Sequence, residues 1–134
     1  RVKLIMASVM KHLLPGLVQP SGLNVNHISH DGAIVEKYQT DPLNHGKISV
    51  SLYYGANDAA KYVLSHASEL KVRTLILHGS DDQITSPEGS REFAGKTRMA
   101  ELKIIEGGYH ELHNEPFKEI VFRYIMEWIL RPKS

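Results

Sequence analysis

The chain has 134 residues, 42% of them hydrophobic and 23% charged, with a formal net charge of +1 and no cysteine. This composition suits one domain with a hydrophobic core, and it lacks the concentrated positive charge that binds nucleic acid. The absence of cysteine excludes disulfides and thiolate-bound metals and fits a reducing compartment, so we expect a cytoplasmic location. No apolar run approaches the roughly 18 residues of a membrane span, so we expect no stable membrane insertion.

The first 70 residues indicate a region of helices and loops without a convincing strand. We expect helices over 1–14 and 31–38 and one or two helices over 47–70, and residues 1–14 and 47–70 have apolar residues at helical spacing. Asp31 suits the N-cap of the second helix, because its side chain can accept a hydrogen bond from the first turn. Turn-forming residues recur through 15–30, which predicts a long loop of the kind that often serves as a lid. We interpret residues 1–70 as a helical cap.

Residues 71–134 alternate strands and helices, which predicts an α/β fold with a parallel sheet. We expect the order strand, helix, strand, helix at 72–78, 86–96, 102–106 and 116–130. The first strand, VRTLILH, is short, β-branched and apolar, as in a parallel strand covered on both faces. A strand–helix–strand unit implies a right-handed parallel crossover. Two such strands need neighbours, so we expect the remaining strands to come from upstream sequence or from a second chain.

Two residues with catalytic chemistry follow the two predicted strands. Asp82 lies in the turn after the first strand, and His110 lies in the loop after the second. Because open parallel sheets bind ligands at the carboxyl ends of their strands, both side chains are expected at one site. A carboxylate beside a histidine fixes its tautomer and stabilises the imidazolium that forms when the ring takes a proton. The pair therefore predicts the acid and the base of a hydrolytic site.

Other interpretations of these residues stay open. Asp82 could only cap its turn, and His110 could be a buried structural histidine. Asp81 is a second carboxylate, although it better suits capping the turn or facing solvent. His113 could join the pair in a zinc site, but no HExxH helix accompanies them, so we expect no metal and no cofactor. His78 suits packing at the strand end. The other histidines share no spacing and receive no role: His12, His27, His30, His45 and His66.

The segments HGSDDQITSP and GGYHELHNEP, residues 78–87 and 107–116, carry a resemblance. Together they resemble the acid and histidine loops of the serine α/β-hydrolases that include monoacylglycerol lipases, lysophospholipases and serine aminopeptidase-like esterases. In that family the second acid and the histidine after the aromatic residue are catalytic, which supports Asp82 and His110. YQTDPL, residues 38–43, resembles a cap segment near the acyl and glycerol pocket. The resemblance covers nearly the whole chain and implies the C-terminal portion of an α/β-hydrolase fold.

One departure from the family concerns the nucleophile. The family presents a serine in a GxSxG elbow, in the order Ser, Asp, His, and no GxSxG occurs in these 134 residues. The upstream His-Gly loop that shares in the oxyanion hole is also absent from the sequence. The resemblance therefore implies that the first strands and the serine belong to a longer protein. We expect the chain alone to have no esterase activity.

For the longer protein we expect hydrolysis of monoacylglycerol or lysophospholipid-like esters. Tyr38, Leu52 and Tyr53 are the candidate substrate-binding residues, although such residues could equally form the core of the cap. The same order of acid and histidine also suits peptidases, thioesterases, epoxide hydrolases and haloalkane dehalogenases. A different interpretation is a non-catalytic unit that docks its exposed strand edge onto a partner sheet. The expected partners are thus a lipid ester and the missing half of the fold.

Overall fold

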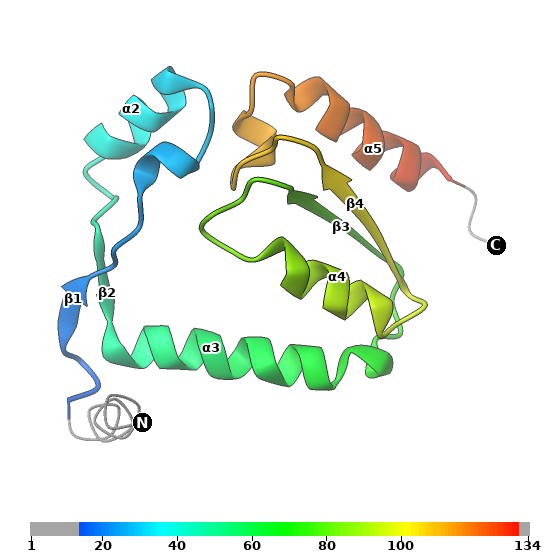
Figure 1. Ribbon diagram of the computed structural model, residues 1–134, viewed down its shortest axis with the longest axis horizontal. Helices are drawn as coiled ribbons and strands as arrows, with labels where there is room; N and C mark the ends of the chain where they lie inside the picture. The colour runs from blue at the N-terminus through cyan, green and yellow to red at the C-terminus, as the bar shows by residue number, and fades with distance from the viewer. Residues whose placement is uncertain (1–13, 132–134) are drawn as a thin grey trace.

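The computed structural model describes residues 14–131 (Figure 1). The helices and strands are β1 (Val18–Pro20), α2 (Gly32–Thr40), β2 (Lys47–Ser49), α3 (Val50–Ser65), β3 (Thr74–Gly79), α4 (Pro87–Gly95), β4 (Ala100–Ile105) and α5 (Lys118–Leu130). Three short 3-10 turns are η1 (Val25–His27), η2 (Ala67–Glu69) and η3 (Leu112–Asn114). Residues 1–13, which hold nearly all of the helix expected over 1–14, lie outside the described residues. Within 14–131 no helix is long and apolar enough to cross a lipid bilayer.

The strands β1 and β2 show that the expectation of no strand before residue 70 was wrong. They pair antiparallel, with Gln19 opposite Ile48, and each has three residues. Strands this short show no alternation of apolar and polar residues, and their pairing depends on a partner distant in sequence. Pro20 ends β1, where its missing N–H is tolerated at a sheet edge. As a result β2 replaces the start of the helix expected over 47–70.

The helices of the N-terminal region begin at side-chain caps. The carboxylate of Asp31 accepts a hydrogen bond from the backbone N–H of Ala33 at 2.9 Å, which confirms the predicted cap of α2. Ser49 caps α3 in the same way, with its hydroxyl oxygen 3.2 Å from the backbone nitrogen of Leu52. The long helix α3 runs along the base of Figure 1, from the β1–β2 pair to the β3–β4 pair. It therefore connects the two parts of the molecule.

The strands β3 and β4 form the predicted parallel pair, in register from Thr74 opposite Ala100 to Gly79 opposite Ile105. This confirms the order strand, helix, strand, helix, with small shifts at the strand boundaries. Alternate residues of β3 face opposite sides of the sheet. Ile76 borders a groove shared with α3 and α4, whereas Leu77 lies with residues of α5. Helices thus flank both faces, as a parallel sheet requires.

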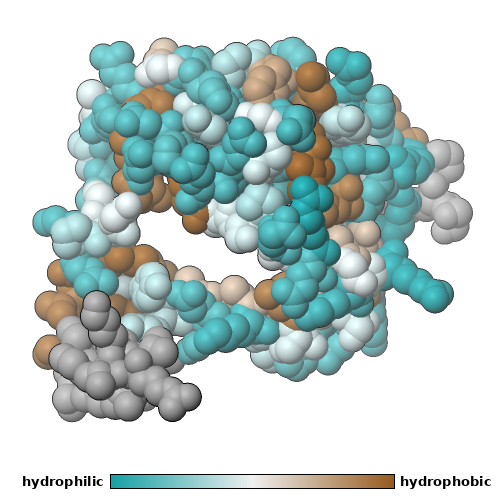
Figure 2. Space-filling model, in the orientation of Figure 1, coloured by the Kyte–Doolittle hydropathy of each residue, from teal (hydrophilic) through white to brown (hydrophobic). Residues whose placement is uncertain are grey.

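The best-buried apolar cluster lies where β4, η3 and α5 meet. Ile105, Leu112 and Val121 are buried there, and the partly buried residues packed against them are Leu77, Phe117, Tyr124 and Ile125. Ile28 and Val50 are also buried, but many other large apolar side chains stay accessible, and Figure 2 shows an opening between α3 and the elements above it. Among residues 14–131, β3 pairs only with β4. Its other edge is where a further strand of the sheet would pair.

Candidate active site

The acid turn begins where β3 ends, and it holds the carboxylate of Asp82. This residue is only 8% exposed. Its Oδ1 accepts backbone N–H bonds from Ile84 at 2.8 Å and from Thr85 at 2.9 Å. Its Oδ2 accepts the hydroxyl of Thr85 at 2.7 Å. The turn therefore fixes the carboxylate, and Oδ2 is the oxygen that meets the loop after β4.

The environment of Asp82 keeps its carboxyl group ionised. Burial alone would raise its pKa, but hydrogen bonds from the ring of His110 and from Thr85 and Ile84 outweigh burial and lower the pKa to about 2. Asp82 therefore carries its negative charge throughout the neutral range.

The histidine loop follows β4 and carries His110 to the carboxylate. The ring nitrogen Nδ1 of His110 lies 2.9 Å from Oδ2 of Asp82. An ionised carboxylate only accepts hydrogen bonds, so Nδ1 carries the hydrogen and Nε2 of the neutral ring is the basic nitrogen. The His110 side chain is 37% exposed, and its Nε2 makes no hydrogen bond within residues 14–131. This nitrogen can therefore accept a proton from a third group.

Glycines allow the acid turn and the histidine loop to touch. The backbone N–H of Asp81 donates to the carbonyl of Gly108 at 3.0 Å, and that of Gly107 donates to the hydroxyl of Ser80 at 2.8 Å. A Cβ atom on Gly79 would overlap the carbonyl oxygen of Gly108. Gly107 has a φ of 69°, in the left-handed region that favours glycine. This close approach brings the carboxylate and the imidazole together.

Two further side chains contact Asp82 that the sequence did not assign to a site. Nε2 of His78 lies 3.1 Å from Oδ2 of Asp82, and its Nδ1 lies 2.7 Å from the hydroxyl of Ser90. His78 was expected only to pack at the strand end. The hydroxyl of Thr85 also contacts the carboxylate. Sequence spacing gives no signal for these contacts, because they depend on how the turn folds back over β3.

The alternative zinc site does not assemble in the described part of the chain. Within residues 14–131, no group of three or more His, Cys, Asp or Glu residues could hold a metal ion. His113 is exposed, and its Nε2 lies 3.3 Å from the side-chain nitrogen of Asn114. His113 thus adds no third ligand to Asp82 and His110.

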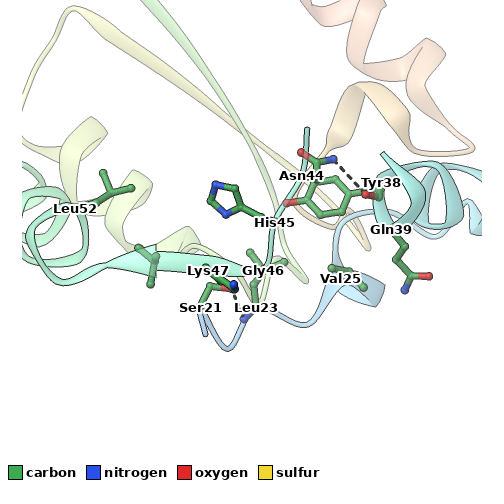
Figure 3. Close-up of a pocket in the computed structure, with 11 residues that line it drawn as sticks. Ser21, Leu23, Val25, Tyr38, Gln39, Asn44, His45, Gly46, Lys47 and Leu52 are labelled. Atoms are coloured by element: carbon green, nitrogen blue, oxygen red, sulfur yellow. Dashed lines mark hydrogen bonds between the residues drawn. The ribbon is translucent and has the colours of Figure 1, made fainter. Parts of the chain in front are cut away.

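A pocket of about 370 Å³ lies between the loop that follows β1, α2, β2 and the start of α3. Tyr38 of α2 and Leu52 of α3, two of the three predicted substrate-binding residues, enter it from opposite sides (Figure 3). The side-chain nitrogen of Asn44 donates to the carbonyl of Tyr38 at 3.2 Å and holds this part of the wall. Tyr53, the third predicted residue, does not line this pocket but lies edge-to-face against Tyr54, with ring centroids 5.3 Å apart. The pocket includes neither residue of the Asp82–His110 pair.

A second, mostly apolar groove of about 590 Å³ reaches the acid turn. Residues of α3, β3, the acid turn and α4 line it, and two of them, His78 of β3 and Thr85 of the turn, contact the carboxylate of Asp82. The apolar lining of the groove includes Val63 and Leu64 of α3 and Ile76 of β3. An apolar surface therefore extends to the neighbours of the carboxylate.

The chain is similar in sequence to several known proteins. Residues 1–117 match the family described as serine aminopeptidase, S33. An uncharacterized abhydrolase domain-containing protein of Dictyostelium discoideum is 34% identical over 131 residues, which cover 96% of this chain and 14% of that protein. A monoacylglycerol lipase of Mycolicibacterium smegmatis is 28% identical over 132 residues, which cover 96% of this chain and 47% of the lipase.

A solved structure shows the same fold. The crystal structure of the Paleococcus ferrophilus monoacylglycerol lipase matches with a TM-score of 0.87 and 31% identity, covering 96% of this chain and 51% of that one. The chain thus spans about half the length, or less, of the relatives that it matches. The family match extends over most of the chain and includes the acid turn and the histidine loop. The chain therefore belongs to the serine aminopeptidase S33 family and forms the C-terminal portion of an α/β-hydrolase fold.

Proposed function

We propose that the protein containing this chain hydrolyses carboxylic esters with a serine–histidine–aspartate triad, in which His110 is the base and Asp82 the acid. The observation that carries the proposal is the 2.9 Å contact between Nδ1 of His110 and Oδ2 of Asp82, which leaves Nε2 as the basic nitrogen. In this proposal the serine lies outside these 134 residues, because their sequence contains no GxSxG. The chain alone would then be inactive.

The proposed reaction uses Nε2 of His110 twice. In the first half, Nε2 takes the proton of the serine hydroxyl as the serine oxygen attacks the ester carbonyl carbon. The resulting imidazolium is stabilised at Nδ1 by the charge of Asp82, and Nε2–H then protonates the leaving alcohol oxygen as the carbon–oxygen bond breaks. In the second half, Nε2 takes a proton from water, which attacks the acyl-enzyme. Release of the carboxylic acid returns the serine and the neutral imidazole.

The proposed substrates are esters of monoacylglycerol or lysophospholipid type. Two proteins similar to the chain are named monoacylglycerol lipases, which supports this class. We assign residues 1–70 to a cap over the site. The pocket between Tyr38 and Leu52 would hold part of the substrate, because it joins apolar side chains to polar groups from β2 and the loop before it.

The first test uses the full-length protein that contains these residues. Wild-type protein should be labelled by a fluorophosphonate probe and should hydrolyse p-nitrophenyl butyrate. His110→Ala should lose both activities and still unfold cooperatively with a slightly lower midpoint, because the ring is 37% exposed and lies outside the buried apolar cluster but donates a hydrogen bond to Asp82. His113→Ala, which removes an exposed ring from the same loop, is the matched control and should keep wild-type kcat. An active His110→Ala enzyme would refute the assignment.

A second test addresses the substrate pocket. Leu52→Ser removes an apolar side chain from the pocket wall. We expect kcat/KM for a long-chain monoacylglycerol to fall about tenfold, which corresponds to the free energy of burying one leucine side chain against the acyl chain. The kcat/KM for p-nitrophenyl acetate should change little. Leu43→Ser is the control, because Leu43 is 86% exposed and does not line the pocket. Equal losses of kcat/KM for the long and the short ester in Leu52→Ser would mean that the acyl chain binds outside this pocket.

A further inference from the structure

Glu115 is a charged residue buried within the histidine loop. The residue is 1% exposed, and its side chain is fully buried. Its Oε1 accepts the backbone N–H of Tyr109 at 2.7 Å, and its Oε2 accepts the backbone N–H of His30 at 3.1 Å. Nδ1 of the His30 ring lies 3.1 Å from both oxygens. A buried carboxylate is stable only when hydrogen-bond donors such as these compensate for its loss of hydration. The groups around Glu115 therefore stabilise its negative charge.

The partners of Glu115 come from two segments that are far apart in the sequence. One is the histidine loop, through Tyr109, and the other is the segment 27–31 before α2. The ring of His30 stacks on that of Tyr109 with centroids 3.7 Å apart and an interplanar angle of 23°. The carboxylate therefore lies at the junction between the histidine loop and the entry to the N-terminal region.

Backbone contacts continue this junction on both sides of Glu115. The backbone N–H of Glu111 donates to the carbonyl of Ile28 at 2.8 Å, and the hydroxyl of Ser29 donates to the carbonyl of Asn114 at 2.8 Å. The backbone N–H of His110 itself lies 3.4 Å from the carbonyl of His27. The segment 27–31 thus supports the backbone of the loop that presents the proposed base.

We propose that Glu115 is a positioning residue, which holds the histidine loop so that His110 meets Asp82 and links this loop to the segment 27–31. The inference rests on the proposed function of His110. Glu115 acts through the backbone of Tyr109, the residue directly before His110, and through His30. The backbone at Tyr109 sets the orientation of the adjacent His110 imidazole. Side chains at reactive sites depend on such outer hydrogen bonds for their geometry.

The role requires a carboxylate and not only a polar group of the same shape. Each oxygen of Glu115 accepts a backbone N–H, from Tyr109 on one side and from His30 on the other. A glutamine at this position would place its own NH₂ group against one of these N–H donors. The loop or the segment 27–31 would have to move to relieve that contact. A displacement of about 1 Å at a reacting group can lower a rate about a hundredfold.

The experiment compares Glu115→Gln with Glu106→Gln in the full-length protein. Glu106 is an exposed carboxylate at the start of the same loop, so its substitution makes the same change of charge without touching the junction. For p-nitrophenyl butyrate we expect Glu115→Gln to lower kcat about tenfold to a hundredfold with KM within about threefold of wild type. The low-field proton NMR resonance of the His110 Nδ1–H should shift or broaden. Glu106→Gln should leave all three quantities unchanged.

A folded Glu115→Gln protein with wild-type kcat and an unchanged low-field resonance would overturn the inference. If Glu115→Gln does not fold, His30→Ala decides with the same measurements, because it removes the ring's hydrogen bond to Glu115 and its stacking on Tyr109 but keeps both backbone donors. We then expect kcat to fall about fivefold, as for one lost hydrogen bond, and an unchanged kcat and resonance would overturn the inference. If the wild-type protein hydrolyses no ester, the proposed function fails. The NMR resonance would still report whether Glu115 holds His110 against Asp82.

Discussion

Replacing Asp82 with asparagine separates the proposed chemistry of the carboxylate from its structural contacts. Oδ1 of Asp82 accepts two backbone N–H groups of its own turn, and the side-chain oxygen of an asparagine can keep both. The NH₂ group then takes the place of Oδ2 and faces Nδ1 of His110. Because NH₂ can only donate there, Nδ1 must accept and the ring proton moves to Nε2. The imidazole is then in the wrong tautomer to take a proton from the serine.

We expect a large loss of kcat, because the substitution removes both the reactive tautomer of His110 and the negative charge of Asp82. The same substitution in a serine protease triad lowers kcat about ten thousandfold, and we expect a loss of that order here. This factor corresponds to about 5.5 kcal/mol of transition-state stabilisation. The overall fold should be retained, because the turn keeps its two backbone hydrogen bonds to the side-chain oxygen of residue 82.

The assay is the steady-state hydrolysis of p-nitrophenyl butyrate by the full-length protein, with thermal unfolding measured in parallel. Asp81→Asn is the matched control: Asp81 is the adjacent carboxylate, is exposed, and accepts its hydrogen bond from the hydroxyl of Ser80. We expect this control to keep wild-type kcat within about threefold. A loss of less than tenfold in Asp82→Asn, or an equal loss in Asp81→Asn, would refute the assignment of Asp82.

Two further predictions concern stability. In the folded protein the pKa of Asp82 is about 2, below the value of roughly 3.9 for an unfolded aspartate. Ionised Asp82 therefore stabilises the fold above about pH 4, and this stabilisation is lost as the pH falls toward 2. In urea unfolding between pH 5 and pH 2 the wild type should lose about 2 kcal/mol more than Asp82→Asn, and equal losses would contradict the lowered pKa. Gly79→Ala places a Cβ against the carbonyl of Gly108 and should lower the free energy of unfolding by about 1–3 kcal/mol or more. Gly55→Ala, at an exposed position inside α3 with no atom near its Cβ, should instead stabilise by up to about 1 kcal/mol, and equal effects of the two would contradict the close packing of the loops.

The C-terminal part of the fold could be predicted because its signals are local. The β-branched run before Gly79 and the apolar stripe of α5 each mark an element by their own residues. Asp82 and His110 then follow the strand ends, and the parallel pairing brings those ends to the same edge. Their contact is therefore a consequence of topology, which the order of the elements already indicates.

The N-terminal region could not be predicted to the same extent, because its structure depends on contacts between distant residues. β1 and β2 exist only as partners of one another, and Ser49 both ends β2 and caps α3. Tyr38 and Leu52 share a pocket, but the neighbouring Tyr53 lies on another side of the same helix. A sequence pattern places a residue on a helix, whereas the packing of that helix decides which side lines a cavity.

In the proposed function, the residues that orient the His110 ring are separate from the pocket that would bind the substrate. The side-chain hydrogen bonds of Asp82 and His110 come from β3 and the two loops beside it, and Glu115 ties one of these loops to the segment 27–31. The pocket of Tyr38 and Leu52 shares no residue with this network. Substitutions in the network should therefore change kcat through the orientation of the imidazole, whereas substitutions in the pocket should change the choice between long and short esters. Glu115 connects the hydrogen-bond network to the pocket. The segment 27–31, which Glu115 holds, leads directly into α2, and α2 carries Tyr38 of the pocket wall.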